Sequence, residues 1–417
     1  MNRLLVLLYG KKIGTLDQEE DGSLLFQYDR HWLKKGAIPL SRSLPLRPDP
    51  FKGDEVRPYF EGLLPAGNLR HLVEKNCRVK EGDVFNLLRC IGGECAGAVS
   101  VQAERKGPVL RRPRKVIRLA GEGLAAVVAS LPKYPLLAGK SGVRLSISGT
   151  RNKLPVVLRG ADTFLPSETL RSTHFLKIGV VFPFFRLLEG EAFCSDLAAA
   201  VGLKVAPAKT RMIGETRCLE VERYDRCGPN GTTVWWHQED FHQALGMLPE
   251  AKYKAESAPP AQTCVNMIRE WSTCPALDLL AFLDGLVFGA LIGRIRPRGA
   301  GFSFIYRDGE RRLAPSYDWD DGITNGTLME FYRRSKDSGG ADPESLTESC
   351  WRTLADECRL SWPWLRERIL RLCAKAVKAL GDPQGLRGRH INTLVTKAAD
   401  IIQERADTLH RNLLSGG

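Results

Sequence analysis

The residues that could do chemistry in this chain are of the types that a phosphoryl-transfer site needs. Such a site has a loop over the phosphates, a lysine that pairs with them, acids that hold magnesium, and a group that receives the substrate hydroxyl. The loop candidate is Ser146-Ile147-Ser148-Gly149-Thr150-Arg151-Asn152-Lys153. Its small residues let backbone N–H groups approach phosphates, and Lys153 adds charge. Serine and glycine turns are common, so this loop alone is a weak signal.

The other parts of such a site follow the loop in chain order. Lys177 ends an apolar strand and is the candidate for the phosphate-binding lysine, and Glu191 on the next helix could orient it. A hinge candidate follows at Glu222-Arg223-Tyr224-Asp225-Arg226. Asp318, which follows Tyr317, is the candidate for the metal-binding acid. A lone lysine at a strand end is usually a surface residue, but the order and spacing of all these residues together favour one site.

The elements that must position these residues form two differing halves. Residues 1–104 alternate short strands with turns, including a hairpin of Leu4–Tyr9 and Ile13–Leu16, and then become helical. Residues 105–118 hold seven Lys or Arg with two prolines and are typical of an exposed linker. Residues 119–243 mix strands with one helix from about Glu189 to Gly202, and residues 244–417 are helical nearly to their end. This plan predicts two lobes with a nucleotide cleft between them.

Composition limits the partners and the compartment. The 417 residues carry a net charge of +13, which favours an acidic partner such as nucleic acid, an acidic protein or a polyphosphate nucleotide, although a basic solvated surface explains it equally well. The eleven cysteines form no CxxC pair and no zinc-ligand spacing, so we expect a reducing cytoplasm and no disulfide framework. The longest apolar stretch, residues 277–293, contains two aspartates and is too short to span a membrane.

In combination, these and other motifs resemble the HipA family, the kinase toxins of bacterial toxin–antitoxin pairs. The resemblance runs over most of the chain. The motifs that carry it are Phe60–Pro65, Ile91–Ala98, Lys153–Val156, Ser172–Lys177, Val221–Arg226, His237–Gly246, Lys252-Tyr253 and Leu313–Asp318.

The resemblance implies an α+β, two-lobed, protein-kinase-like fold with a mixed α/β N-terminal lobe and an all-α C-terminal lobe. It implies ATP and Mg²⁺ as cofactors and serine phosphorylation of an aminoacyl-tRNA synthetase. It also implies a helix-turn-helix antitoxin of the HipB type, through which DNA is contacted. By resemblance, Ser146 is the autophosphorylated serine, Lys177 the ATP lysine, residues 222–224 the adenine hinge, and Asp318 the Mg²⁺ ligand.

The chain departs from the family at the catalytic loop, whose frame runs from Gly293 to Phe302-Ser303. The family pattern is roughly Gly-Asn-x-Asp-x-His-x-Lys-Asn-Phe-Ser. The residues that replace its polar positions are Arg294 for Asn, Arg296 for the catalytic Asp, Arg298 for His, Ala300 for Lys and Gly301 for the metal-binding Asn. In the cover loop, Arg151 stands where the family usually has Gln.

These replacements oppose ordinary catalysis. Arginine stays protonated and cannot act as a base, and losing a positioned general base lowers the rate by about 10²–10⁴. A guanidinium about 5 Å from Mg²⁺ would repel it by roughly 6–7 kcal/mol at an effective dielectric constant near 20. We therefore expect Arg296, with Arg294 or Arg298 as alternatives, to pair with Asp318, so that an ion pair replaces the metal bridge between the loop and the aspartate.

Three interpretations follow. The first is a HipA-like pseudokinase that binds nucleotide without metal through Lys177, Arg298 and the neighbouring residues Gly301 and Tyr317. The second is an active serine/threonine kinase in which Asp320 or Asp321 replaces the missing acid. The third is a protein that binds nucleic acid directly, which the charge favours although no DNA-binding motif supports it.

Overall fold

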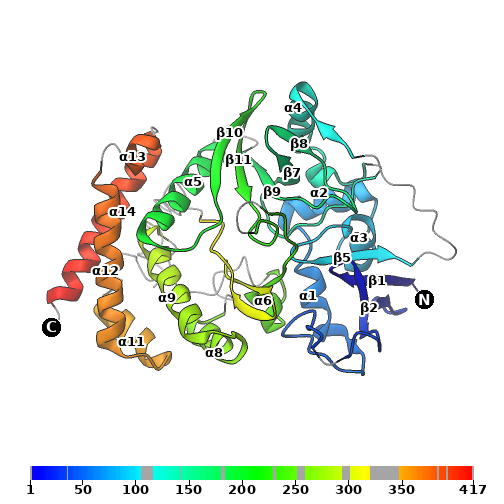
Figure 1. Cartoon of the computed structure of the whole chain (residues 1–417), viewed down its shortest axis with the longest axis horizontal. Coiled ribbons are helices and arrows are strands. Elements are labelled where there is room, and N and C mark those ends of the chain that lie inside the picture. Colours follow the sequence, from blue (N-terminus) through cyan, green and yellow to red (C-terminus); the bar gives the residue numbers. More distant parts are fainter. Residues whose placement is uncertain are drawn as a thin grey trace. The chain divides into compact units, whose positions relative to one another are not determined.

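The chain folds into two compact units that are each assembled from separate stretches of sequence (Figure 1). The first unit comprises Met1–Ile178, Arg211–Ala258 and Ser303–Glu310, and the second comprises Gly179–Thr210, Pro259–Phe302 and Arg311–Gly417. The structure is a computed structural model. The residues that it describes are 2–34, 36–104, 116–140, 142–179, 184–228, 232–250, 259–293, 301–319, 347–382, 385–390 and 393–415.

A five-stranded sheet with the order β4-β3-β2-β1-β5 opens the first unit. The predicted N-terminal hairpin is confirmed, because β1 pairs antiparallel with β2. Tyr9 and Gly10 both have positive φ, 53° and 73°, as a tight two-residue hairpin turn requires. The elements of this part are β1 (Asn2–Leu8), β2 (Lys11–Gln18), β3 (Leu24–Tyr28), β4 (Phe51–Lys52), α1 (Arg57–Glu61), α2 (Gly67–Cys77), α3 (Val84–Ile91) and β5 (Val99–Ala103).

A second sheet of six strands follows, with the order β10-β11-β9-β7-β8-β6. Its apolar side chains alternate along the strands, so that Leu154, Leu176 and Cys218 share one core with helix α4 residues such as Leu124. The elements are β6 (Arg118–Leu119), α4 (Gly121–Ser130), β7 (Lys153–Arg159), β8 (Asp162–Phe164), β9 (His174–Ile178), β10 (Ala208–Ile213) and β11 (Thr216–Glu222).

A third set of strands brings a distant segment into the first unit. Strand β12 (His237–Asp240) pairs antiparallel with β13 (Ser303–Arg307), and α6 (Phe241–Leu245) follows β12 directly. The chain then leaves the first unit within β14 (Glu310–Leu313). Strands β13 and β14 lie within residues 244–417, which the apolar periodicity predicted to be helical nearly to their end. The prediction was wrong for these two strands.

Helices make up most of the second unit. Helix α12 packs against α5, α9 and α14. The predicted C-terminal end of α5 is confirmed, since Val201 is its last residue and Gly202 follows with φ +99°. The helices are α5 (Phe184–Val201), α8 (Ala261–Trp271), α9 (Pro275–Leu291), α11 (Glu348–Glu357), α12 (Trp362–Leu380), α13 (Leu386–Arg389) and α14 (Thr393–Ser415).

One expectation about cysteine was wrong. Cys77, the last residue of α2, forms a disulfide with Cys90 in α3, with 6.4 Å between the two Cα atoms. The other nine cysteines are free. Sequence spacing did not indicate the pair because the turn between the two helices, and not a short motif, brings the residues together. Within the described ranges, none of the helices has the length and apolar character needed to cross a membrane.

Candidate functional site

The two lysines of the predicted site lie opposite each other in the six-stranded sheet. Lys153 opens β7, Lys177 lies near the end of β9, and the two residues are direct partners in the antiparallel register. Direct partners point to the same face of a sheet, and their Cβ atoms are about 5 Å apart. Both side chains are buried, with 7% and 3% exposure. Because the core residues Leu154 and Leu176 alternate with them, the lysines lie on the face opposite that core.

The predicted cover loop runs directly into this pair. Gly149 has φ +117°, a conformation that side chains rarely adopt, and an ideal Cβ at this position would lie 3.0 Å from the Nζ atom of Lys153. The lysine ammonium therefore lies against the loop backbone. The amide of Ala66, which precedes α2, donates to the carbonyl of Gly149 at 3.0 Å. Positive charge and small, half-buried residues are thus adjacent, as a phosphate-binding loop requires.

Both ends of the loop are held by hydrogen bonds. Ser146 is fully buried, and its Oγ donates to the carbonyl of Leu63 at 2.8 Å. At the other end, the side-chain amide of Asn152 donates to the carbonyl of Leu131 at 2.6 Å, and the Asn152 carbonyl accepts from the Ile178 amide at 3.1 Å. Between these anchors Thr150 is exposed, whereas Ser148 and Arg151 are half-buried. The predicted phosphoserine therefore lies inside the folded unit, while the loop tip reaches solvent.

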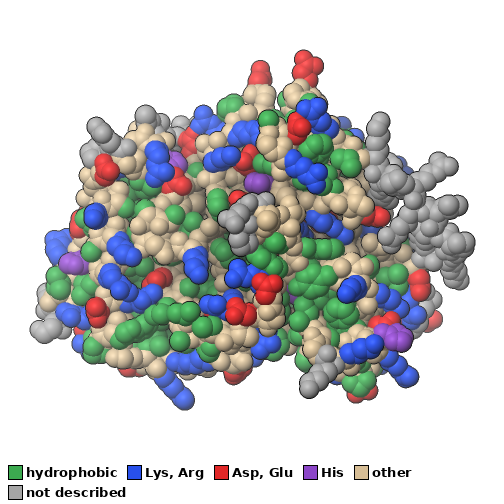
Figure 2. Space-filling model, in the orientation of Figure 1, with side chains coloured by type: hydrophobic (Ala, Val, Ile, Leu, Met, Phe, Trp, Pro, Cys, Tyr) green, Lys and Arg blue, Asp and Glu red, His purple; other side chains and the backbone are tan. Residues whose placement is uncertain are grey.

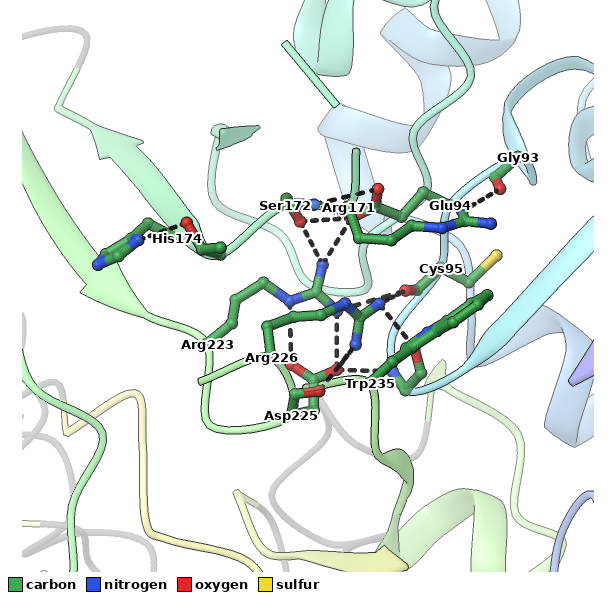
Figure 3. Close-up of polar contacts among 12 residues, drawn as sticks. Gly93, Glu94, Cys95, Arg171, Ser172, His174, Arg223, Asp225, Arg226 and Trp235 are labelled. Carbon is green, nitrogen blue, oxygen red and sulfur yellow. Dashed lines mark hydrogen bonds and ion pairs between the residues drawn. The ribbon is translucent and has the colours of Figure 1, made fainter. Parts of the chain in front are cut away.

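The predicted hinge surrounds a buried cluster of charges (Figure 3). Arg223, whose side chain is 0% exposed, donates to Glu94 at 3.1 Å and to both carboxylate oxygens of Asp225 at 3.0 and 2.8 Å. Arg226 donates to Asp225 at 2.8 Å and to the carbonyl of Gly97 at 2.7 Å. The guanidinium of Arg223 is therefore hydrogen-bonded within this network. Adenine binding by residues 222–224 remains a prediction, and for Arg223 it would involve the backbone.

Two other hinge residues differ in exposure and contact. The hydroxyl of Tyr224 donates to the side-chain oxygen of Gln238, and Glu222, the last residue of β11, is half-buried. Their predicted contacts with a nucleotide remain predictions.

Electrostatics keep the buried cluster ionised. Burial by itself would raise the pKa of Asp225, but Arg223 and Arg226 outweigh it and lower that pKa to about 2. Burial and the neighbouring Arg223 lower the pKa of Arg226 to about 10, which still leaves it charged at neutral pH. The cluster therefore carries balanced charges, and removing one partner would leave an opposite charge buried.

The second unit holds the remaining described candidates. Asp318 has φ +54°, in the left-handed region where Asp is tolerated better than most residues. The segment before it is fixed, because Ser316 pairs with Val205, in the stretch that follows α5. Helix α5 also carries Glu191, which is buried. Lys177 and Glu191 belong to different units, so their pairing remains a prediction.

Aromatic packing against α9 fixes the exit of the predicted catalytic loop and the segment after Asp318. Phe302 lies 4.8 Å from Phe282, and Trp319 lies 4.9 Å from Phe288, measured between ring centroids. An ideal Cβ on Gly285 would approach the Phe302 ring to 2.8 Å, so glycine makes room for this contact. The frame on either side of the altered loop is therefore well packed.

The residues that decide catalysis fall partly outside the described part. Gly301 is described, has φ +89°, and has no side chain to hold a metal. The described residues do not include four residues of the catalytic loop, Arg294, Arg296, Arg298 and Ala300, or the two acidic candidates, Asp320 and Asp321. The expected ion pair between Arg296 and Asp318 therefore stays a prediction. In the described ranges, no group of three or more His, Cys, Asp or Glu could hold a metal ion.

Sequence reasoning missed the role of Glu94 as a partner of Arg223. The Gly92-Gly93-Glu94 motif indicated only a resemblance, and a charged residue between small ones gave no further signal of burial. A small pocket was also not foreseen. It is lined by Pro58, Gly62, Leu64, Ser148, Asp240, His242, Gln243, Met247 and Pro249. Ser148 of the cover loop borders it, but neither Lys153 nor Lys177 does.

Direct nucleic-acid binding stays a prediction. On the face drawn in Figure 2, Lys and Arg side chains are scattered among apolar and acidic ones and do not gather in one stripe. The predicted linker at 105–118 has only residues 116–118 within the described part.

Comparison with known proteins gives a consistent result over almost the whole chain. The family model of the HipA N-terminal domain matches residues 4–102, and that of the HipA-like C-terminal domain matches residues 145–380. "Putative kinase Y4mE" of Sinorhizobium fredii is 36% identical over 382 residues, which is 89% of each chain. "Serine/threonine-protein kinase toxin HipA" of Shewanella oneidensis is 27% identical over 307 residues, covering 70% of this chain and 68% of that one.

The fold has a solved counterpart. The HipA chain in a Shewanella oneidensis complex of HipA, HipB and operator DNA superposes with a TM-score of 0.74 and 21% identity, covering 99% of this chain and 97% of that one. The predicted class, an α+β kinase-like fold of the HipA type, is thereby confirmed.

Proposed function

Because this chain belongs to the HipA family, we propose that it is a kinase-fold protein that binds a nucleotide polyphosphate but does not carry out ordinary phosphoryl transfer. The observation that carries the proposal is the pair of buried, facing lysines at the end of the cover loop. Two ammonium groups beside a glycine loop can both donate charge-assisted hydrogen bonds to a polyphosphate.

The residues present fit a nucleotide better than they fit Mg²⁺. Lys153, Lys177 and the backbone around Gly149 would hold the phosphates. Mg²⁺ usually takes one or two carboxylates with substrate phosphates, and Asp318 is the one described candidate ligand, since Gly301 has no side chain. When bound, the metal neutralises charge on the transferred phosphoryl group. Arg296 in the sequence supplies neither a base nor a ligand.

The partner follows from the family. The related Shewanella HipA was solved with HipB and operator DNA. We propose that this chain also binds a helix-turn-helix antitoxin of the HipB type, contacts DNA through it, and works in the cytoplasm. A pseudokinase would then act as a regulator or as an alternative target for the antitoxin.

An active kinase is the second candidate, because Ser146, Lys177, Glu191 and Asp318 are all retained. In that case Asp320 or Asp321 would supply the missing acid, and ATP with Mg²⁺ would be the cofactors. The substrate would be an aminoacyl-tRNA synthetase. Changing Asp318 to Asn would then abolish activity.

Two measurements on the purified full chain separate these candidates. Calorimetric titration with ATP, with and without Mg²⁺, should show binding that does not require the metal and that weakens at least tenfold in Lys177→Met. The intact mass after incubation with ATP and Mg²⁺ should show no added phosphate. A phosphate at Ser146 would instead establish the active kinase, and an absence of ATP binding would overturn the nucleotide proposal.

A further inference from the structure

The loop of residues 93–97 belongs to the stretch that matches the HipA N-terminal domain, yet it is held mainly by residues of the C-terminal match. The chief contacts come from Ser146, Ser172, Arg223 and Arg226, all within the first compact unit. Figure 3 shows the side chains of Ser172, Arg223 and Arg226 converging on the loop from separate segments. The loop is thus an internal part of the neighbouring domain.

Glu94 makes the most varied contacts in this loop. Its buried carboxylate accepts from the amide of Ser172 at 3.1 and 3.3 Å, from the Ser172 hydroxyl, and from Arg223 at 3.1 Å. Its carbonyl accepts from the amide of Ser146 at 2.8 Å, and its own amide donates to the Arg144 carbonyl at 2.9 Å. One residue therefore joins three segments that are far apart in sequence.

Each of these three segments leads into the candidate nucleotide site. Ser146 begins the cover loop that ends at Lys153, and Ser172 lies two residues before the strand that carries Lys177. Arg223 lies in the hinge, just after β11. The Glu94 side chain therefore positions the lysine strand and the hinge, and the Glu94 backbone carbonyl positions the cover loop.

The residues on either side of Glu94 in the 93–97 loop are tightly packed and hydrogen-bonded, which fixes the position of the Glu94 backbone. Gly97 has φ +64°, and an ideal Cβ there would lie 2.6 Å from the Gln238 amide nitrogen. The Gly97 amide donates to Asp225 at 2.9 Å. Arg171 donates to the Gly93 carbonyl at 3.2 Å and stacks over Trp235 at 4.4 Å.

We propose that Glu94 is a positioning residue for the nucleotide site. A residue of the HipA N-terminal domain would thus affect nucleotide affinity without contacting the nucleotide. Glu94 does not touch the nucleotide; it orients the cover loop, the Lys177 strand and the hinge through Ser146, Ser172 and Arg223. The expected change in affinity rests on the proposed nucleotide binding, whereas the expected change in local order does not.

The test compares the full-length wild type with Glu94→Gln, which keeps the side-chain length but removes the charge. The matched control is Glu74→Gln, because Glu74 is also buried and also accepts from an arginine, Arg70 at 2.9 Å, and from a backbone amide, Gly82 at 3.1 Å. Glu74 lies in α2, outside the three segments. Glu94→Asp, which restores the charge, tests rescue.

Two readouts are measured. Hydrogen exchange of the nucleotide-free proteins should be at least tenfold faster in residues 172–178 and 222–227 of Glu94→Gln, with β1 and β2 unchanged. Residues 144–152 should change less, because their bonds are to the Glu94 backbone, which the substitution keeps. The Kd for ATP should rise at least tenfold in this variant, while its Tm falls no more than that of Glu74→Gln. Glu94→Asp should recover part of both effects.

The outcomes separate the two proposals. Unchanged exchange in residues 172–178 and 222–227, or faster exchange throughout the unit, would overturn the positioning role whether or not ATP binds. If the wild type binds no ATP, the proposed function fails, and the exchange pattern still decides the role of Glu94. Should Glu94→Gln not fold, Ser172→Ala removes one partner hydroxyl and is expected to loosen residues 172–178 by a smaller factor.

Discussion

The two compact units hold their candidate residues by different means. In the first unit, buried ion pairs among Glu94, Arg223, Asp225 and Arg226 fix the hinge. In the second unit, aromatic rings packed on α9 fix the segments on either side of the altered loop. The first arrangement depends on every charge being matched, whereas the second depends on shape and volume.

This difference explains which substitutions the chain has tolerated. Losing one member of a buried ion network leaves its partner charged and desolvated. Phe302 and Trp319 contact aromatic rings of α9, and these contacts require no matched charge. Such a frame can persist where, as the resemblance implies, Arg296 replaces the catalytic Asp and Gly301 replaces the metal-binding Asn.

Restoring the family loop is the largest effect that this comparison predicts. If the α9 frame is intact, the combined changes Arg294→Asn, Arg296→Asp, Arg298→His, Ala300→Lys and Gly301→Asn should raise phosphate transfer by about 10²–10⁴. Asn is tolerated at positive φ, which Gly301 adopts. The measurement is mass-spectrometric detection of phosphate at Ser146 after incubation with ATP and Mg²⁺.

The control for this experiment adds Asp318→Asn to the restored loop, which should remove the gain. A restored chain that stays inactive while binding ATP as tightly as before would show that the frame has changed together with the loop.

Breaking the buried network should cost most in stability. Arg223→Leu leaves Glu94 and Asp225 without their shared cation, a loss of about 3–5 kcal/mol. Thermal unfolding should show a large fall in Tm. Arg118→Leu is the control, since Arg118 pairs with Asp162 and both side chains are exposed, at 61% and 42%, so this change should alter Tm little. Equal effects of the two changes would contradict the distinction between buried and exposed pairs.

Removing either facing lysine should weaken nucleotide binding. Hydrogen bonds to charged groups contribute about 1.5–3 kcal/mol, so Lys153→Met should raise the Kd for ATP by roughly 10–150-fold. The Kd of the wild type should also rise with salt concentration, because the attraction is between charges. Lys140→Met is a suitable control because Lys140 is exposed and lies over Tyr134. An unchanged Kd in Lys153→Met would place the phosphates elsewhere.

Crowding the aromatic frame should have a smaller effect on stability. Gly285→Ala places a methyl group 2.8 Å from the Phe302 ring, and overpacking of this kind costs about 1–3 kcal/mol. The matched control is Gly123→Ala in α4, where an added Cβ meets nothing within 4 Å and the better helix propensity of alanine should raise Tm slightly. A rise in Tm for both variants would show that Phe302 moves freely.

The smallest predicted effect is on pH dependence. Burial lowers the pKa of His237 to about 4, so its contribution to stability falls as pH drops from 6.5 to 4. Burial raises the pKa of Glu239 to about 7, so its contribution increases as pH drops from 7 to 4.5. Between pH 6.5 and 4.5 the two contributions offset each other.

The Glu239→Gln variant exposes this compensation. Its stability should fall by about 1.4 kcal/mol per pH unit more than that of the wild type as pH drops from 6.5 to 4.5. Thermal unfolding of both proteins across this range is the measurement. Parallel pH profiles would indicate that the two groups do not titrate as their burial implies.

Local features of this fold could be predicted from the sequence because neighbouring residues determine them. The N-terminal hairpin and the end of α5 before Gly202 both follow from short-range patterns. Lys153 and Lys177 face each other because of the register between β7 and β9. The sequence predicted both strands but not which of their residues pair. The bond between Glu94 and Arg223 joins residues 129 positions apart, and no local pattern indicates such a partner.

The three-segment composition of the first unit has a consequence for synthesis. Strand β12 acquires its partner only after residues 303–307 have left the ribosome, although the lysine pair is complete by residue 177. At about 5–20 residues per second, this delay is on the order of ten seconds. Until then β12 is an unpaired edge, which invites association with other chains. A prematurely terminated chain therefore cannot finish the unit that carries the candidate nucleotide site, and the first unit matures only after two of the three stretches of the second unit have been made.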